Sequence, residues 1–396
     1  METLWKKYEY LLSRFSLEKK RYLYGQIDWD NRLIGIKGAR GTGKTTLLLQ
    51  RLKEMSLSSR EAAYFSLDDL YFSTHRLVDT AELFYRQGGR YLFLDEVHKY
   101  AGWSAHIKNL YDFYPDLHIV FTGSSIIDIA REEADLSRRV LMHELTGLSY
   151  REYLYFNDMG TFSPVTLEEI LHPERPWRQH FPADFRPLQY FPDYLRYGYY
   201  PFATEDIPGF TTRMQQLIRI IVEYDMAALH DFDVRNARKM LQLLYVLAAN
   251  VPFKPNITSL AEKSNIHRNT VGNYLHFLEQ AKLIRQLYPP GISLAVLQKP
   301  EKIYLDNTSL AFAIHTDQPD KGNLRETFFA AQVAAGHTLH YAQKGDFLVN
   351  NKWTFEIGGK HKTQKQIQGV PDSYIVADDT DYPVSVLPLW LFGFLY

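Results

Sequence analysis

Four stretches of this 396-residue chain carry side chains suited to phosphate or metal chemistry. In the first, residues 38–45 (GARGTGKT) match the pattern G-x-x-x-x-G-K-[ST]. Glycine adopts backbone angles closed to other residues, which lets successive N–H groups converge on an anion. The pattern therefore predicts a phosphate-binding loop. Its residues are Gly38, Ala39, Arg40, Gly41, Thr42, Gly43, Lys44, Thr45 and Thr46.

The loop's polar residues have separate expected tasks. Lys44 is expected to reach the β- and γ-phosphates of a nucleoside triphosphate, and the Thr45 hydroxyl is expected to hold Mg²⁺. Residues 33–36 (LIGI) form the short apolar run of a buried parallel strand, and residues 46–52 begin a helical pattern of leucines. The loop is therefore expected between a strand and a helix, where phosphate binding requires it.

The second stretch, residues 91–98 (YLFLDEVH), predicts an apolar strand with two carboxylates at its C-terminal end. Ligands of open α/β sheets collect at that end of the strands. We expect Asp95 to position Mg²⁺ through water and Glu96 to polarise the attacking water. A pair of acids that only caps a strand is the alternative, which the phosphate-binding loop upstream disfavours.

A further apolar run, residues 118–125 (HIVFTGSS), ends in hydroxyl groups. In ATPases of the additional-strand class this strand lies between the other two, so its end contacts both the γ-phosphate and the attacking water. Thr122, Ser124 and Ser125 are the candidate sensors, with Ser124 preferred. Capping of a following helix is a compatible role.

Arg138 and Arg139 precede a predicted strand over residues 140–145. An arginine there can act as a finger toward a neighbouring molecule's phosphate, which implies a homo-oligomer. A solvated basic pair is the equal alternative. The core lacks an Asn-Lys-x-Asp guanine-recognition pattern, which favours ATP over GTP. ATP and Mg²⁺ are therefore the expected cofactors.

Four patterns together carry a family resemblance: residues 91–99 (YLFLDEVHK), 102–103 (GW), 121–125 (FTGSS) and 147–154 (GLSYREYL). They are similar to a widespread bacterial and archaeal family of AAA-superfamily ATPases, and the resemblance covers nearly the whole chain. It implies an α/β fold with a P-loop parallel sheet of the additional-strand type. A helical lid, a winged helix and a C-terminal α/β restriction-endonuclease-like domain of uncharacterised role are implied to follow.

The expected domains are residues 1–150 (ATPase), 151–250 (helical lid and linker), 251–300 (winged helix) and 301–396 (endonuclease-like). Residues 157–190 are rich in Pro, His and Phe without clear periodicity, which favours a long insertion or loop. The last ten residues, 387–396, are apolar but too short to span a bilayer, and are expected to form a buried strand or helix.

Residues 257–298 predict a winged helix, with helices over 260–266 and from 269, and then a strand, a turn and a return strand over 292–297. Residues 251–300 contain six Lys or Arg against two acids, a local charge of +4 in a chain of net charge −1. DNA contact is therefore one expectation, and packing or protein docking is the other. The candidate DNA-contacting residues are His267, Arg268, Asn269, Thr270 and Asn273.

The fourth stretch lies in the C-terminal region, where residues 302–307 are expected to form a strand and a turn. Its spacing resembles the restriction-endonuclease fold, in which an Asp and a Glu bind Mg²⁺ and a lysine two residues after the Glu activates water. Gly358 occupies that lysine position, and Lys360 can substitute only if its side chain turns back. A degenerate site used for binding or as a scaffold is therefore expected, with an active nuclease as the alternative. The site residues are Glu326, Asp346, Glu356 and Lys360.

The amino-acid composition excludes several kinds of site and location. The chain has no cysteine, which excludes disulfides, zinc–thiolate sites and thiol catalysis. No run approaches the ~18 apolar residues of a membrane span, and the N-terminal residues lack the apolar segment of a secretion signal. A cytoplasmic location without a membrane partner is therefore expected.

These patterns predict a Mg²⁺-dependent protein that binds and hydrolyses ATP and acts as a nucleotide-driven switch, with partner binding as its output. Two alternatives remain open. One is an ATP-gated DNA nuclease, and the other is a regulator whose winged helix binds DNA under the control of ATP.

Overall fold

The computed structural model describes residues 2–13, 16–124, 136, 138–172, 174–226, 234–249, 257–264, 266–291, 300–314, 318–359, 362–378, 381–382 and 386–396. These residues divide into two units, one ending at Thr146 and the other beginning at Gly147. In the described part of the chain, no helix combines the length and the apolar character needed to cross a membrane.

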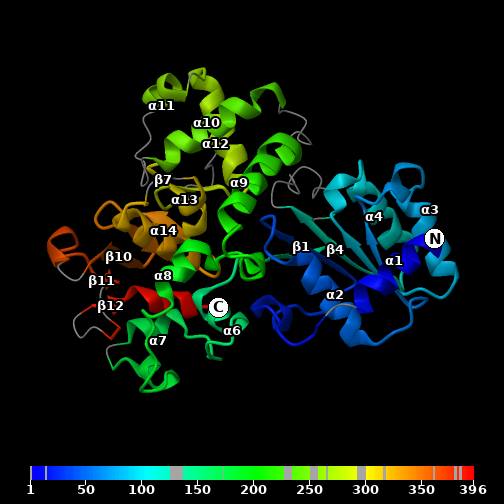
Figure 1. The fold of residues 1–396 in the computed structure, drawn as a ribbon, viewed down its shortest axis with the longest axis horizontal. Helices are drawn as coiled ribbons and strands as arrows, with labels where there is room; N and C mark the ends of the chain where they lie inside the picture. Colours follow the sequence, from blue (N-terminus) through cyan, green and yellow to red (C-terminus); the bar gives the residue numbers. More distant parts are fainter. Residues whose placement is uncertain are drawn as a thin grey trace. The chain divides into compact units, whose positions relative to one another are not determined.

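The first unit is built on a five-stranded parallel sheet in the order β2-β3-β4-β1-β5. Its paired strands β1 and β4 are labelled in Figure 1. Because β4 pairs with both β1 and β3, the prediction of an additional strand between the two site-bearing strands is confirmed. The strands are β1 (Leu33–Gly38), β2 (Ala62–Ser66), β3 (Tyr91–Asp95), β4 (His118–Ser124) and β5 (Leu141–Glu144). The helices are α1 (Glu2–Ser13), η1 (Tyr22–Gly25), α2 (Lys44–Met55), η2 (Leu70–Ser73), α3 (Leu77–Arg86), η3 (Val97–Lys99) and α4 (Trp103–Phe113).

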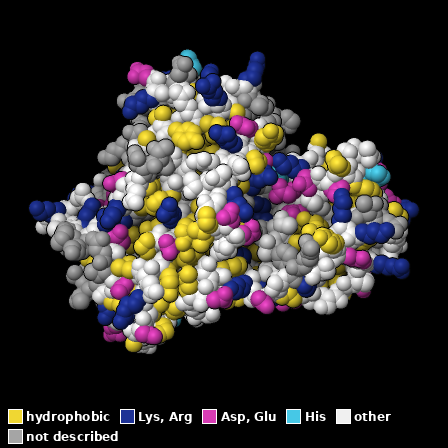
Figure 2. All heavy atoms as spheres, viewed as in Figure 1, with side chains coloured by type: hydrophobic (Ala, Val, Ile, Leu, Met, Phe, Trp, Pro, Cys, Tyr) yellow, Lys and Arg dark blue, Asp and Glu magenta, His cyan; other side chains and the backbone are white. Residues whose placement is uncertain are grey.

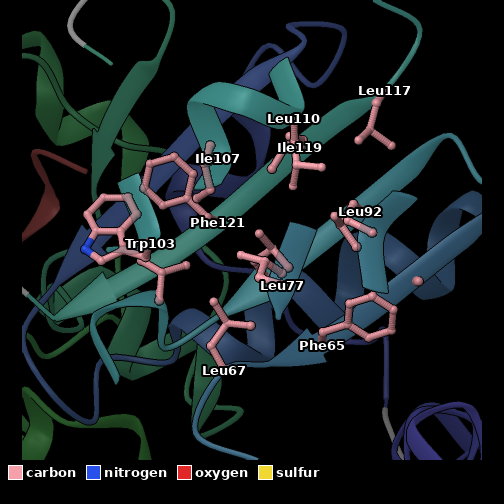
Figure 3. Close-up of a cluster of buried hydrophobic side chains, with 14 of the residues drawn as sticks. Phe65, Leu67, Leu77, Leu92, Trp103, Ile107, Leu110, Leu117, Ile119 and Phe121 are labelled. Atoms are coloured by element: carbon pink, nitrogen blue, oxygen red, sulfur yellow. The ribbon is translucent and has the colours of Figure 1, made fainter. Parts of the chain in front are cut away.

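Helices cover both faces of this sheet, because successive side chains of a strand point to opposite faces. On one face, Phe121 of β4 packs in a cluster with Leu77 of α3 and Ile107 of α4 (Figure 3). On the other face, Val120 of β4 lies in a cluster with Leu48 of α2. Each fully buried side chain of this size stabilises the fold by ~1.5–3 kcal/mol. These two cores hold the carboxyl ends of β1, β3 and β4 in fixed positions.

The second unit begins with helices and short turns. They are α6 (Tyr150–Phe156), α7 (Leu167–Leu171), η4 (Pro176–His180), α8 (Phe191–Asp193), η5 (Tyr194–Gly198), η6 (Pro201–Glu205), α9 (Phe210–Ile220), η7 (Ile221–Asp225), η9 (Val234–Asn236), α10 (Ala237–Ala248), α11 (Ile257–Ser264) and α12 (Arg268–Gln280). Residues 157–190 are more ordered than a loop, since they include α7 and η4 and bury Trp177 completely. The reason is aromatic packing, in which the Trp177 ring lies edge-on to Trp390 near the C-terminus.

A two-stranded antiparallel sheet follows α12, formed by β6 (Ile284–Leu287) and β7 (Lys302–Leu305). Residues Lys302–Leu305 form a strand, as the sequence predicts, and this strand pairs with β6 and not with the C-terminal sheet. All four β7 residues are buried. The expected return strand over residues 292–297 lies outside the described residues. The winged-helix interpretation of this region stays a prediction.

The C-terminal part of the second unit is a mixed five-stranded sheet in the order β12-β11-β10-β9-β8, in which β9 is antiparallel to both neighbours and β10–β12 are parallel. The last residues, as expected, are buried as a short strand and a helical turn. The elements are α13 (Thr308–Ile314), α14 (Lys321–Val333), β8 (Leu339–Tyr341), β9 (Phe347–Val349), β10 (Trp353–Gly358), η11 (Gln364–Gln366), β11 (Ser373–Ala377), β12 (Leu387–Pro388) and η12 (Leu389–Phe394).

Candidate active site

The glycine-rich loop joins β1 to α2, as the sequence predicts. Gly41 and Gly43 have φ values of +84° and +93°, in the left-handed region that favours glycine. Gly38 is required for a different reason, since a Cβ there would lie 2.3 Å from the backbone oxygen of Leu145. The loop therefore needs glycine at three positions, and it ends at the N-terminus of a 12-residue helix.

Lys44 is buried and donates hydrogen bonds to the backbone oxygens of Gly38 and Ala39, both at 3.0 Å. The Thr42 hydroxyl donates to the Ala39 oxygen at 2.9 Å. Arg21 is a residue that sequence reasoning missed. Its buried guanidinium donates to the Thr42 oxygen at 2.6 Å and to the Thr146 oxygen at 2.8 Å. The ammonium and the guanidinium together fix the loop's carbonyl groups.

Asp95, at the end of β3, is the centre of the hydrogen-bond network. Its carboxylate is 2% exposed and accepts from the hydroxyl of Thr45 at 2.6 Å, from that of Tyr64 at 2.8 Å, and from that of Thr122. Burial, with the Asp95 charge second, raises the pKa of Tyr64 well above its ordinary value, so the phenol stays protonated and donates. The structure thus brings Thr45 and Asp95 together from α2 and β3.

Glu96 has an unusual backbone, with φ +53° in a region that non-glycine residues rarely adopt. Its N–H lies 3.2 Å from both the Asp95 carboxylate and the Thr122 hydroxyl, which hold this conformation. Its own carboxylate is 26% exposed and lies 3.5 Å from His98 Nε2. A strained backbone of this kind persists only where surrounding contacts maintain it, and such residues are often found at functional sites.

The candidate sensor residues of β4 have different contacts. The Thr122 hydroxyl is fully buried between Asp95 and Glu96, whereas the buried Ser124 donates its backbone N–H to His98 Nδ1 at 3.5 Å. Ser125 lies outside the described residues. Thr122 is therefore the hydroxyl of β4 that contacts Asp95, and the sensor role of Ser124 stays a prediction.

The two candidate finger arginines also differ. Arg138 is exposed, while Arg139 makes a two-point ion pair with Asp112 of α4, at 2.9 and 3.1 Å. Of the remaining loop residues, Arg40 and Thr46 are half-buried. The finger role of either arginine stays a prediction.

The donor set of this site fits a nucleotide with its metal ion. Hydroxyl and carboxylate oxygens, such as those of Thr45 and Asp95 at 2.6 Å from each other, are ligands that Mg²⁺ prefers. The loop lies at a helix N-terminus beside a lysine, a combination that favours polyphosphate. The fold and the site together define a P-loop nucleotide-binding domain of the additional-strand class.

Two family models match parts of the chain. Residues 30–154 match a family model described as an AAA domain, and residues 188–321 match a domain of unknown function, DUF8612. The second match spans the expected domain boundaries near residues 250 and 300, so that finer division stays a prediction.

The chain is 29% identical to an uncharacterized protein of Methanocaldococcus jannaschii, a match that covers 90% of this chain and 84% of the relative. Among solved structures it is similar to AMPPCP-bound DnaA from Aquifex aeolicus, with 14% identity, 71% of this chain and 87% of that one covered, and a TM-score of 0.28. A second is a DNA replication initiation factor, with 13% identity, coverage of 68% and 92%, and a TM-score of 0.30.

In the second unit, the carboxylates singled out by the sequence are paired with lysines. Lys302 lies 2.9 Å from Asp346 and 3.5 Å from Glu326, and the Tyr304 hydroxyl donates to Glu326 at 2.6 Å. Burial and then the Asp346 charge raise the pKa of Glu326, which the Lys302 ammonium opposes. One ammonium group therefore bridges two of the candidate metal ligands.

Glu356 is 1% exposed and pairs with Lys362 at 2.5 Å. The Lys362 side chain runs across Gly358, where an added Cβ would lie 2.6 Å from the Lys362 Cδ. Lys360, the expected substitute lysine, lies outside the described residues. In the part of the chain that the structure describes, no group of three or more Asp, Glu or His side chains is placed to hold a metal ion.

The candidate DNA-contacting residues lie at the start of α12 and just before it. His267, Arg268 and Asn273 are exposed and Thr270 is half-buried, while the side chain of Asn269 lies outside the described residues. On the face drawn in Figure 2, basic and acidic side chains are interspersed, in keeping with the near-zero net charge of the chain. DNA contact therefore stays a prediction that depends on local contacts.

Proposed function

We propose that the first unit binds ATP with Mg²⁺ and hydrolyses it. The proposal rests on one observation. The Thr45 hydroxyl donates a hydrogen bond of 2.6 Å to the Asp95 carboxylate, beside the loop that ends in Lys44. Two elements far apart in sequence place oxygen ligands together at the carboxyl end of the sheet, where nucleotides bind in open α/β folds.

Each residue has a separate task in this proposal. The loop N–H groups and the Lys44 ammonium bind the phosphate oxygens and stabilise the charge that develops on them. Thr45 and Asp95 would hold the metal ion, which neutralises phosphate charge when it is bound. Glu96 orients a water molecule and accepts its proton. Thr122 keeps Asp95 and Glu96 in a fixed relation by bonding to both.

For the output of hydrolysis, we propose a nucleotide-driven switch that controls partner binding. The ammonium groups of Lys302 and Lys362 form ion pairs with the candidate metal-binding carboxylates of the C-terminal part. These ion pairs favour a scaffold over a metal-dependent nuclease. The exposed His267, Arg268 and Asn273 keep a DNA-binding regulator as the second candidate.

Two variants test the ATPase proposal. Lys44→Ala is expected to lose ATP binding in calorimetry, because it removes the cation that faces the phosphates. Glu96→Gln is expected to keep ATP binding and to lose turnover by about 10²–10⁴-fold, the usual contribution of a general base. Turnover in Glu96→Gln equal to the wild type would assign the base to another residue.

Two further assays separate the outputs. If the winged-helix region binds duplex DNA, the affinity should fall with salt and with Arg268→Ala. Cleavage of DNA with Mg²⁺ or Mn²⁺ that disappears in Asp346→Ala/Glu356→Ala would instead establish a nuclease. A change of assembly state with ATP, without either DNA effect, is the result that the switch predicts.

A further inference from the structure

His98 contacts two parts of the site through its two ring nitrogens. It lies in η3, two residues after Glu96, and its side chain is 7% exposed. Its Nδ1 lies 3.5 Å from the backbone nitrogen of Ser124, at the end of β4, and its Nε2 lies 3.5 Å from a carboxylate oxygen of Glu96. One buried ring therefore lies between the end of β4 and the proposed catalytic base.

The Ser124 contact determines where the ring proton lies. A backbone N–H can only donate, so Nδ1 must present its lone pair to Ser124. In the neutral ring the proton is then on Nε2, the nitrogen that faces Glu96. This tautomer turns the Nε2–H group toward the carboxylate, 3.5 Å away, a distance slightly longer than a usual N–H···O hydrogen bond. The opposite tautomer would place an N–H against the Ser124 N–H.

The contact with His98 acts at the far end of the Glu96 side chain. Its backbone is fixed by its N–H contacts to Asp95 and Thr122, but its carboxylate is partly exposed at the end of a flexible chain. A general base must be held within hydrogen-bond distance of the proton that it accepts. Around bound metal ions, outer hydrogen bonds of a comparable kind orient the ligating side chains.

We propose that His98 is a positioning residue, which holds the Glu96 carboxylate in its catalytic orientation and couples that orientation to the end of β4. The inference rests on the proposed ATPase function of the same site. The consequence is that a displacement of Ser124 changes the orientation of Glu96 through one side chain. ATP hydrolysis is thereby linked to the conformation of the strand that lies between β1 and β3.

Kinetics of three substitutions test the proposal. Gln places an amide donor near the position of Nε2, whereas Asn places an acceptor near that of Nδ1. His98→Ala and His98→Asn are expected to lower kcat by about 10–100-fold, while His98→Gln recovers most of the loss. The Kd for ATP should stay within about twofold for all three, since the residue acts on the water and not on the phosphates.

A double-mutant cycle decides whether His98 acts through Glu96. Adding His98→Ala to Glu96→Gln should lower kcat no further, because the carboxylate it positions is already absent. A further tenfold loss in the double variant, or equal rates for the Gln and Asn variants, would overturn the proposal. His118→Ala serves as a packing control, since His118 lies at the opposite end of β4, beside the Tyr91 ring.

A measurement that needs no turnover separates this inference from the proposed function. In protein with ¹⁵N-labelled histidine, the His98 signals are assigned by their loss in His98→Gln. We expect the Nε2–H tautomer, with a signal that shifts in Glu96→Gln. The Nδ1–H tautomer, or no shift, refutes the contact. Wild-type protein that binds ATP without hydrolysing it would instead refute the ATPase proposal and any effect of His98 on turnover, while the NMR result still decides whether His98 holds Glu96.

Discussion

The hydroxyl of Tyr64 gives the most direct test of the Asp95 network. Tyr64→Phe removes one donor from a buried carboxylate and leaves the ring in place, so the hydrogen bond of 2.8 Å is the main loss. A hydrogen bond to a charged group contributes about 1.5–3 kcal/mol net. We therefore expect the unfolding free energy of the first unit to fall by that amount. The carboxylate retains its contacts with Thr45, Thr122 and the Glu96 N–H.

Hydrogen exchange followed by mass spectrometry measures this loss in peptides that cover β2 and β3, without interference from the second unit. A loss of 1.5–3 kcal/mol corresponds to exchange that is roughly 10- to 150-fold faster. Tyr8→Phe is the matched control. Tyr8 is also buried and stacks on Tyr64 at a ring-centroid distance of 6.4 Å, but its hydroxyl makes no hydrogen bond within the part of the chain that the structure describes.

The stability difference between wild type and Tyr64→Phe has a defined pH dependence. Because the folded-state pKa of Tyr64 is raised, the stability it contributes is fully present below the ordinary tyrosine pKa of about 10 and is lost as pH rises through the folded value. The difference between wild type and Tyr64→Phe should thus be constant from pH 6 to 9 and should shrink above about 10. Exchange in Tyr64→Phe no faster than in Tyr8→Phe would show that the phenol does not support Asp95.

Two other substitutions test the loop and the C-terminal cluster. Gly38→Ala places a Cβ against the Leu145 oxygen at 2.3 Å, so we expect ATP affinity to fall at least about tenfold in calorimetry, while Gly25→Ala, which has open space around it, leaves it unchanged. Lys302→Met leaves two half-buried carboxylates without their shared cation and should cost up to roughly 3–5 kcal/mol in urea denaturation. Since the folded-state pKa of Glu326 is already raised and loses a cation that lowers it, this cost should be larger at pH 8 than at pH 5. An equal cost at both pH values would contradict the ion-pair interpretation.

The sequence predicts the first unit well, because its signals are local. Apolar runs ending in Gly38 and Asp95 are strands in the structure, and the loop between β1 and α2 has the glycine conformations that phosphate binding needs. The position of β4 between them followed from the class of ATPase and not from spacing. Spacing alone does not determine the order of parallel strands, since every crossover connection permits several orders.

The residues that support the site were not predictable in this way. Tyr64 belongs to a strand whose continuous apolar run marks it as a core side chain, and only the adjacent β3 brings Asp95 to its hydroxyl. Arg21 lies in a segment rich in basic and aromatic residues, and nothing in that composition separates a buried guanidinium from exposed ones. His98 followed two acids in the motif, but its role depends on Ser124 from another strand.

The C-terminal cluster shows why counting along a strand fails at its end. The rule of a lysine two residues after the glutamate assumes that both side chains leave the same face of one strand, since the period is two. In this chain β10 ends at Gly358, and the lysine that reaches Glu356 is Lys362, whose carbon chain fills the space that the glycine leaves open. A glycine at that position therefore does not mean that the cation is missing. It means that the cation comes from the following loop, where its ammonium pairs with the carboxylate and disfavours a metal ion there.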